Sequence, residues 1–312
     1  MQSRFAAWGR CVAAILALAL LACARGVLAP ASGEPAGRGG TPLLWHAQAP
    51  AGGGAYYLLG SVHLGDRRML DLGETIEAAY DASEELVVEV DLSRVTPEEI
   101  AELTTRYAYL TPPATLESVV SAETFEIVLA YLFRTGLPLE AVVHFKPWFL
   151  SFTVVQLELA RAGYETEFGV DRIFIGEAQG SKPIVPLETI ASQLAVLDAT
   201  SREVQELMLR DTLGRSDRLV IETEELIRAW EVGDEERLHQ MVFRPLELSS
   251  KLDSFYERFF FERNRNMAGQ LVELAEDGKT RFVVLGTGHM IGAQGIPALL
   301  GRRGYRVSTL GR

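Results

Sequence analysis

A short sequence pattern occurs twice, near opposite ends of the chain. Residues 57–63, YLLGSVH, match residues 283–289, VVLGTGH. Each copy is an apolar run typical of a buried strand, followed by a glycine, two further residues and a histidine. Glycine at a strand end lets the backbone turn sharply and gives a ligand close access. The repeated pattern predicts one sheet that is assembled from both ends of the chain.

The neighbouring residues predict an α/β fold. Residues 86–92 form a second β-branched run, and residues 70–83 before it have apolar side chains at helical spacing. A strand, a helix and a strand of this total length make a βαβ unit, which indicates a parallel sheet. Residues 183–188, 281–286 and 305–310 predict three further strands. We therefore expect an α/β domain with a central mixed, largely parallel sheet.

The middle of the chain predicts helices. The sequence Thr-Pro-Glu-Glu at 96–99 supplies an N-cap, a proline for the first turn and acids near the positive end of the helix dipole. From there the pattern is mainly helical, so we expect a helix-rich insertion over about 95–245, on or beside the sheet. A longer amphipathic helix is predicted at 254–276, and another begins at Gly295.

The N-terminal residues are typical of an export signal. Arg4 and Arg10 give a positively charged start and precede an apolar stretch at 11–22. This stretch is shorter than the roughly 20 residues that a membrane-spanning helix requires. We expect a signal peptide or lipoprotein signal over 1–29, with a buried N-terminal helix as the alternative. A flexible linker rich in Pro, Gly and Ala follows at 30–54, and the α/β domain spans 55–312.

Both cysteines, Cys11 and Cys23, lie in this N-terminal part. Residues 20–23 resemble a lipobox, whereas a cut at one of the nearby alanines would release a soluble periplasmic protein. Either cut leaves at most one cysteine, which excludes an intramolecular disulfide, and the same count excludes a four-cysteine zinc site. We expect an exported protein, periplasmic or lipid-anchored to the cell envelope, that meets a membrane only through that anchor or an uncleaved signal.

The charge balance bears on the partners. The chain has 42 acidic and 30 basic residues and a formal net charge of −12. Nucleic-acid binding needs a cationic surface that neutralises phosphates, and no run of Lys and Arg supplies one. We therefore expect no nucleic-acid partner, while the composition favours no particular oligomeric state.

The paired histidines predict a metal site. His63 and His289 follow the carboxyl ends of two expected strands, where open α/β sheets bind ligands. One strand-end histidine is more often a structural residue, but two in matching contexts favour ligands. Glu89 and Asp91 alternate with valines, so both carboxylates should share one strand face. We expect Glu89 to be the third ligand or a general base and Asp91 to support it; an exposed strand face is the alternative.

Two histidines and a carboxylate leave positions for water and substrate. A divalent metal in such a site lowers the pKa of its water and polarises a carbonyl. These ligands suit zinc, manganese, cobalt or iron without choosing among them. The sequence contains neither a His-Glu-x-x-His helix nor a Gly-x-Ser-x-Gly elbow, so it predicts neither an ordinary zincin nor a serine hydrolase.

Seven motifs occur in an order that resembles the TraB/PrgY/GumN family. They are residues 58–65, 87–91, 146–148, 169–171, 187–193, 262–264 and 286–292. The resemblance extends over about 44–310. That family is related to the Tiki metalloproteases and, more distantly, to the erythromycin-esterase and ChaN-like proteins.

The resemblance implies a metal-dependent, peptidase-like hydrolase that acts on a peptide or small amide. Its centre would be His63, His289 and Glu89. The Arg-Asn pair of the family falls on Arg263 and Asn264. Physically, the arginine would hold a substrate carboxylate and the asparagine would donate to a developing oxyanion.

Other assignments have competing explanations. Asp171 and Glu188 would support the ligands, although a surface turn and a helix cap also explain them. For Arg263, the alternative is an ion pair with Glu262 or Glu257 on a solvated helix face. The competing function is a binding protein that sequesters a peptide, haem or metal in the same crevice without turnover. A scaffold that has lost its site is disfavoured because the acids are present.

Overall fold

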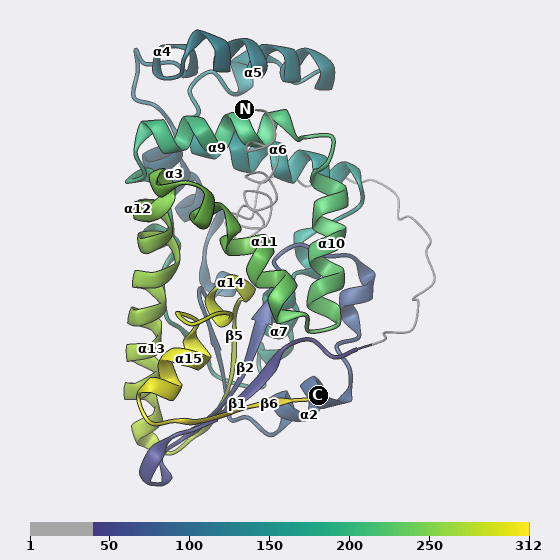
Figure 1. Ribbon diagram of the computed structural model, residues 1–312, viewed down its shortest axis with the longest axis vertical. Coiled ribbons are helices and arrows are strands. Elements are labelled where there is room, and N and C mark those ends of the chain that lie inside the picture. Colours follow the sequence, from purple (N-terminus) through teal and green to yellow (C-terminus); the bar gives the residue numbers. More distant parts are fainter. Residues whose placement is uncertain (1–39, 312) are drawn as a thin grey trace.

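The computed structural model describes residues 40–311, in which a six-stranded sheet lies beneath a group of helices (Figure 1). The strand order is β4-β3-β5-β2-β1-β6. The strands are β1 (Leu44–Gln48), β2 (Ala55–Ser61), β3 (Glu85–Val88), β4 (Ile184–Pro186), β5 (Thr280–Gly286) and β6 (Arg306–Leu310). The predicted fold class is confirmed, because strands from both ends of the chain share one mixed, largely parallel sheet.

The α-helices of the described residues lie mostly between β3 and β5 in the sequence; one precedes β3 and two follow β5. They are α2 (Glu74–Asp81), α3 (Pro97–Ala108), α4 (Leu116–Val119), α5 (Ala122–Thr135), α6 (Pro147–Arg161), α7 (Val170–Ala178), α8 (Ile190–Asp198), α9 (Arg202–Gly214), α10 (Leu219–Glu231), α11 (Glu235–Leu248), α12 (Asp253–Tyr256), α13 (Arg263–Leu274), α14 (Thr287–Met290) and α15 (Ile296–Arg302). The predicted insertion over 95–245 is helical except for β4, which forms one edge of the sheet. Within residues 40–311, no helix is both long enough and apolar enough to span a membrane.

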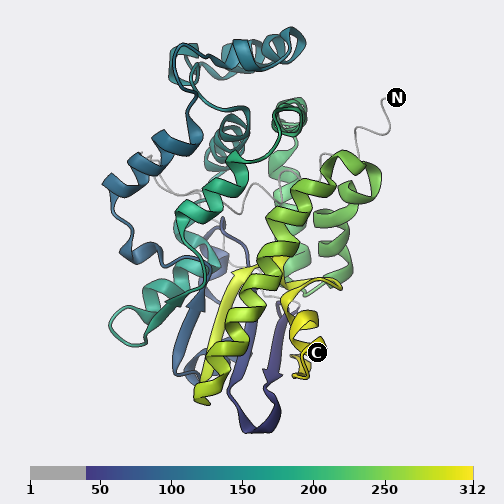
Figure 2. The same cartoon turned by 90° about the vertical axis from the view of Figure 1, so that its left-hand side faces the viewer.

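The two faces of the sheet are covered by different helices. On β5, Arg281 faces α13 and donates to the Leu274 carbonyl at 2.7 Å. The next side chain, Phe282, points to the opposite face and packs against Tyr80 of α2 and Phe174 of α7. This alternation is the period of two that a strand requires. Figure 2 shows α13 lying along its face of the sheet.

The parallel strands bring their carboxyl ends to one edge. β2 and β5 pair in parallel with Ser61 opposite Gly286, and β3 pairs in parallel with β5 and β4. The segments that follow these strands therefore meet at the same edge. These segments carry the predicted histidines and acids.

The linker predicted over 30–54 is wrong for residues 44–48, which form β1. This strand pairs antiparallel with both β2 and β6, and Leu44 and Ala47 are fully buried. The glycines and prolines on either side dominated the composition and hid a strand of five residues. The predictions for residues 1–39, including the export signal, lie outside the described residues.

The second predicted strand is shorter than expected. β3 ends at Val88, not at residue 92. Beyond it, Asp91 caps a short 3-10 turn, because its Oδ1 accepts from the Ser93 N–H at 3.1 Å. The prediction that Glu89 and Asp91 share a strand face is therefore wrong. A local side-chain cap has replaced strand pairing at this point.

Candidate functional site

The two Gly-x-x-His turns lie side by side at the carboxyl edge of the sheet. His63 follows β2, and His289 lies in α14 directly after β5. The Thr287 hydroxyl of the second turn donates to the Ser61 carbonyl of the first at 2.9 Å. A Cβ atom at Gly60 would lie only 3.0 Å from the Thr287 hydroxyl oxygen, so a side chain here would push the two turns apart by a few tenths of an ångström.

His289 is buried and oriented by an amide. Its Nδ1 lies 2.5 Å from Asn264 Oδ1, and Asn264 Nδ2 donates to the Gln294 carbonyl at 2.8 Å. Because Oδ1 can only accept, Nδ1 of His289 carries the proton and Nε2 keeps its lone pair. Burial, together with the nearby Arg263, lowers the pKa of His289 to about 3. The ring is therefore neutral near pH 7.

His63 is oriented by a carboxylate instead. Its Nδ1 lies 2.9 Å from Asp171 Oδ1 at the start of α7. Its Nε2 is buried and has no hydrogen-bond partner among the described residues. Burial lowers the pKa of His63, but the carboxylates of Asp171 and, to a smaller extent, Glu89 together more than offset this, so the pKa is raised. A Cβ at Gly169 would lie 2.6 Å from the His63 carbonyl oxygen, so this glycine lets the α7 loop approach.

Glu89 lies between the second turn and a buried cation. Its Oε1 accepts from the Gly286 N–H at 2.7 Å and lies 3.8 Å from His289 Nε2. Its Oε2 accepts from Arg263 Nη2 at 2.8 Å and from Gln193 Nε2 at 2.9 Å. Burial raises the pKa of Glu89, but the fields of His289 and Arg263 lower it to about 2. Since His289 is neutral at pH 7, Arg263 is the cation that keeps Glu89 ionised there.

Arg263 is a buried bridge rather than a surface residue. Besides Glu89, its Nε and Nη2 donate to Glu188 at 2.9 Å and 2.6 Å. Its Nη1 donates to the Phe259 carbonyl in the π-helical turn Glu257–Glu262, which precedes α13. The alternative of a pair with Glu262 or Glu257 on a solvated helix face is wrong, because Arg263 is buried against Glu89 and Glu188, and Arg265 pairs with Glu257. Most of the Arg263 donors are thus already used inside the protein.

The supporting acids divide into two groups. Asp171 contacts His63 and Glu188 contacts Arg263, so both lie where a supporting residue was predicted. The helix cap that we considered for Glu188 belongs to Thr189, whose hydroxyl oxygen accepts from the Ser192 N–H. Among the described residues, the contacts of the Asp91 carboxylate are with Ser93 and Arg94, so the structure does not bring it into contact with Glu89 as predicted.

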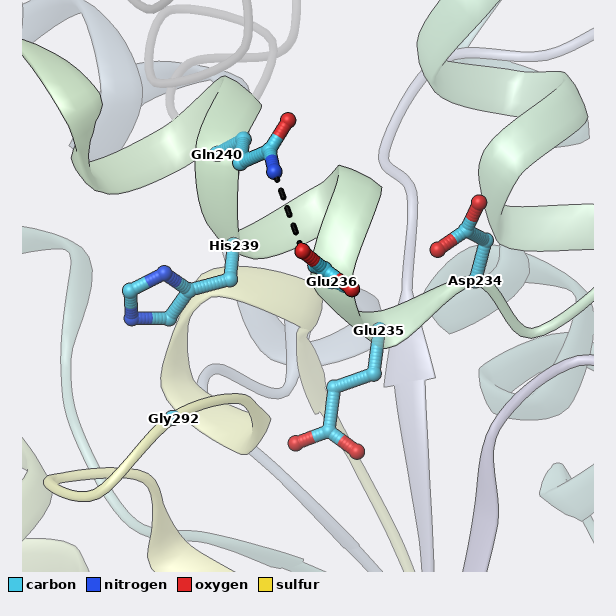
Figure 3. Close-up of a pocket in the computed structure, with 6 residues that line it drawn as sticks. All are labelled: Asp234, Glu235, Glu236, His239, Gln240 and Gly292. Carbon is cyan, nitrogen blue, oxygen red and sulfur yellow. Dashed lines mark hydrogen bonds between the residues drawn. The ribbon is translucent and has the colours of Figure 1, made fainter.

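An acidic pocket of about 600 Å³ opens beside the second turn (Figure 3). It is lined by Asp234, Glu235, Glu236, His239, Gln240 and Gly292. Most of these residues belong to the first turns of α11, and Gly292 lies three residues beyond His289. A Cβ at Gly292 would lie 2.7 Å from the His239 ring, so a side chain there would collide with this wall.

Comparison with known proteins identifies the family. A model of the TraB/PrgY/gumN family matches residues 43–309. The chain belongs to this family. Neither curated proteins nor solved structures gave a match. The predicted resemblance is confirmed over nearly all of the chain that the structure describes.

The histidines of this TraB/PrgY/gumN family member have the chemistry of metal ligands. Metal-binding histidines usually hold their second ring nitrogen against a carboxylate, carbonyl or water. Here Asp171 and Asn264 provide that contact at Nδ1, which leaves Nε2 of His63 and His289 for a ligand. In the described part of the chain, however, no three His, Cys, Asp or Glu side chains are close enough together to hold a metal ion as they stand. The donor chemistry fits a metal, and Glu89 is the nearest candidate for completing the set.

Sequence reasoning gave no role to two groups of this site. One is the backbone N–H of Gly286, which binds Glu89. The other is Gln193, which occurs in a family motif but donates to both Glu89 and Glu188 in the structure. Gln193 lies four residues after Thr189, the N-cap of α8. Its place near the start of a helix that follows a strand was the sequence feature that could have indicated a role in the site.

Proposed function

We propose that this chain is a metal-dependent hydrolase with a peptidase-like activity on peptides or small amides. The observation that carries the proposal is the matched orientation of the two imidazoles. Asp171 lies in ion-pair contact with Nδ1 of His63, and Asn264 accepts a hydrogen bond from Nδ1 of His289, so both Nε2 atoms face away from these partners and remain for a divalent ion. Zinc, manganese, cobalt and iron all suit these donors.

In this proposal His63, His289 and Glu89 hold the ion. When bound, it would supply a Lewis acid and lower the pKa of a water molecule. The carboxylate of Glu89 is ionised at neutral pH because the Arg263 guanidinium holds its pKa below the ordinary value. This favours the role of a ligand that binds a cation over that of a general base. Oε1 is the atom for this task, since Oε2 already accepts two hydrogen bonds.

The predicted roles of Arg263 and Asn264 change accordingly. Arg263 acts through Glu89, because its guanidinium keeps that carboxylate ionised and in place. Asn264 acts through His289, because its amide selects the tautomer with Nε2 unprotonated. Both are positioning residues in this proposal, and neither is assigned a direct contact with substrate.

The location remains part of the proposal. The sequence of residues 1–29 favours export to the periplasm or a lipid anchor at Cys23. Labelling with palmitate that disappears in Cys23→Ser would support the anchor. Recovery of unlabelled protein from the soluble periplasmic fraction would contradict the anchor and support simple secretion.

Metal analysis of purified protein tests the centre of the proposal. Elemental analysis should find a divalent ion in the wild type and little of it in His63→Ala and His289→Ala. His144→Ala is a matched control, because its Nδ1 lies 3.1 Å from the Ala114 carbonyl, outside the site. Equal metal content in all four proteins would show that these histidines are not ligands.

Turnover separates a hydrolase from a binding protein. Incubation with a mixed peptide library, followed by mass spectrometry, should show cleavage products that disappear with a chelator. Glu89→Gln should abolish these products while keeping the fold. A library peptide that binds but is never cleaved by the metal-loaded wild type would favour the sequestering alternative.

A further inference from the structure

Gln193 is part of a closed ring of hydrogen bonds beside the candidate site. Its Nε2 donates to Glu89 Oε2 at 2.9 Å and to Glu188 Oε2 at 3.0 Å. Arg263 Nη2 donates to the same two oxygens, at 2.8 Å and 2.6 Å. Two nitrogen donors thus bridge two carboxylates that would otherwise repel each other.

The amide of Gln193 has only one orientation that fits this ring. Ionised carboxylates only accept hydrogen bonds, so the NH₂ group must face them and both of its hydrogens are used. Gln193 is held by the first turn of α8, where Thr189 caps the helix. The position of the donor is therefore set by the helix start that follows β4.

The charge of the ring explains why an amide is suited to this position. Glu89 and Glu188 carry two negative charges and Arg263 carries one positive charge, so the cluster keeps an excess negative charge. A neutral amide adds two donors without cancelling that charge. A lysine here would remove the attraction that the cluster offers to a divalent cation.

The two oxygens of Glu89 are held from opposite sides. Gly286 N–H holds Oε1 near His289 Nε2, while Arg263 and Gln193 hold Oε2. The terminal torsion of a glutamate is broad, so a carboxylate with fewer donors rotates readily. Without Gln193, Oε2 would keep only Arg263, which is shared with Glu188.

We propose that Gln193 is a positioning residue that fixes the Glu89 carboxylate for metal binding. This inference rests on the proposed function, because it assumes that His63, His289 and Glu89 hold a divalent ion. The proposal gives α8 a role in the site, although the strand-end motifs do not predict one for this helix.

Zinc affinity, measured by competition with a chromophoric chelator, tests the inference. Gln193→Met keeps the length of the side chain but removes both donors, and it should weaken zinc binding about 10- to 100-fold, as loss of a residue that holds a metal ligand typically does. Gln270→Met is the matched control. Gln270 Nε2 donates at 3.1 Å to the carbonyl of Leu187, next to Glu188, but to neither carboxylate. Its zinc affinity should stay within about twofold of wild type.

A double variant distinguishes positioning from general stabilisation. In a Glu188→Gln background the ring is already broken, so Gln193→Met should weaken zinc binding by a smaller factor than in the wild type. Equal factors in both backgrounds would overturn the inference, as would wild-type affinity in Gln193→Met. Gln193→Asn is too short to bridge both oxygens, so it should also weaken binding and gives a second variant if methionine impairs folding.

The proposed function fails in a different way. If the wild type binds none of zinc, manganese, cobalt and iron, or if His63→Ala and His289→Ala bind zinc as tightly as the wild type, the metal centre itself is wrong. If those two variants lose zinc while Gln193→Met does not, only the role of Gln193 is wrong.

Discussion

The two Gly-x-x-His turns are alike in sequence and differ in chemistry. His63 faces a carboxylate of Asp171, and its pKa is raised. His289 faces the amide of Asn264, and its pKa is lowered to about 3. The partners come from different helices, α7 and α13. The repeated motif therefore places the two histidines at equivalent strand ends, while helices that are distant in the sequence determine their pKa values.

The second turn also depends on a buried cation. Arg263 lies within 2.8 Å of Glu89, and both side chains are almost inaccessible to solvent. The first turn has no comparable partner among the residues described. This difference predicts unequal sensitivity to mutation, and three changes test it.

The largest effect should follow from Arg263→Met. It leaves the carboxylates of Glu89 and Glu188 buried without their cation, and breaking a buried pair in this way costs about 3–5 kcal/mol. Urea unfolding followed by circular dichroism measures the loss. Arg265→Met is the control, because Arg265 pairs with Glu257 at the surface and should contribute about 0–1 kcal/mol. If the two variants lose the same free energy of unfolding, the claim that the second turn depends on a buried cation is wrong.

An intermediate effect should follow from Gly288→Ala. The first turn has a valine at the corresponding position, Val62, but a Cβ at Gly288 would lie 2.5 Å from the buried Phe260 ring. Overpacking of this kind costs about 1–3 kcal/mol.

Thermal and urea unfolding measure this loss. Gly269→Ala on α13 meets no atom within 4 Å and should instead stabilise by about 0.5–1 kcal/mol. A Gly288→Ala protein as stable as wild type would mean that the two turns are interchangeable at this position.

The smallest effect should be on the protonation of the first turn. Asp171→Asn removes the carboxylate that contributes most to raising the pKa of His63, so burial and the nearby Arg263 should outweigh the remaining Glu89 carboxylate and the pKa should fall below 6.5. A raised pKa stabilises the folded protein fully below pH 6.5, and this contribution is lost as the pH rises through the folded-state value. The metal-free wild type should lose this contribution over that range, and Asp171→Asn should not. Nuclear magnetic resonance titration of the histidine ring measures the pKa directly.

His289 should behave with the opposite sign. Its pKa of about 3 lies below the ordinary 6.5, so the unfolded chain binds more protons between those values. Its contribution to stability is therefore present above pH 6.5 and lost as the pH falls toward 3. If both histidines of the metal-free wild type titrate at the same pH, the contrast between the turns is wrong.

Local patterns predicted the strands well, and their limits came from tertiary contacts. The apolar runs that became β2 and β5 are strongly patterned, so their existence and neighbouring turns followed from the sequence. β1 was missed because its stability comes from pairing with two strands, one of them at the far end of the chain. β3 was predicted too long because the cap formed by Asp91 competes with strand pairing.

The candidate site was also predictable only where local sequence patterns determine it. His63, Glu89 and His289 follow strand ends, so their neighbourhood could be inferred from a parallel sheet. The burial of Arg263 could not be inferred, because an arginine on an amphipathic helix is expected at the surface unless its buried partners are known. The same holds for Gln193, whose partners are separated from it by 104 and 5 residues.

The position of β5 in the sheet has a consequence for biosynthesis. This strand lies between β2 and β3, yet it is made from residues 280–286, near the end of the chain. Before those residues emerge from the ribosome, β1–β2 and β3–β4 can form only as two separate pairs with open edges. A fragment that ends before residue 280 therefore lacks both a central strand and His289, so the candidate site can be completed only after the last tenth of the chain has been made.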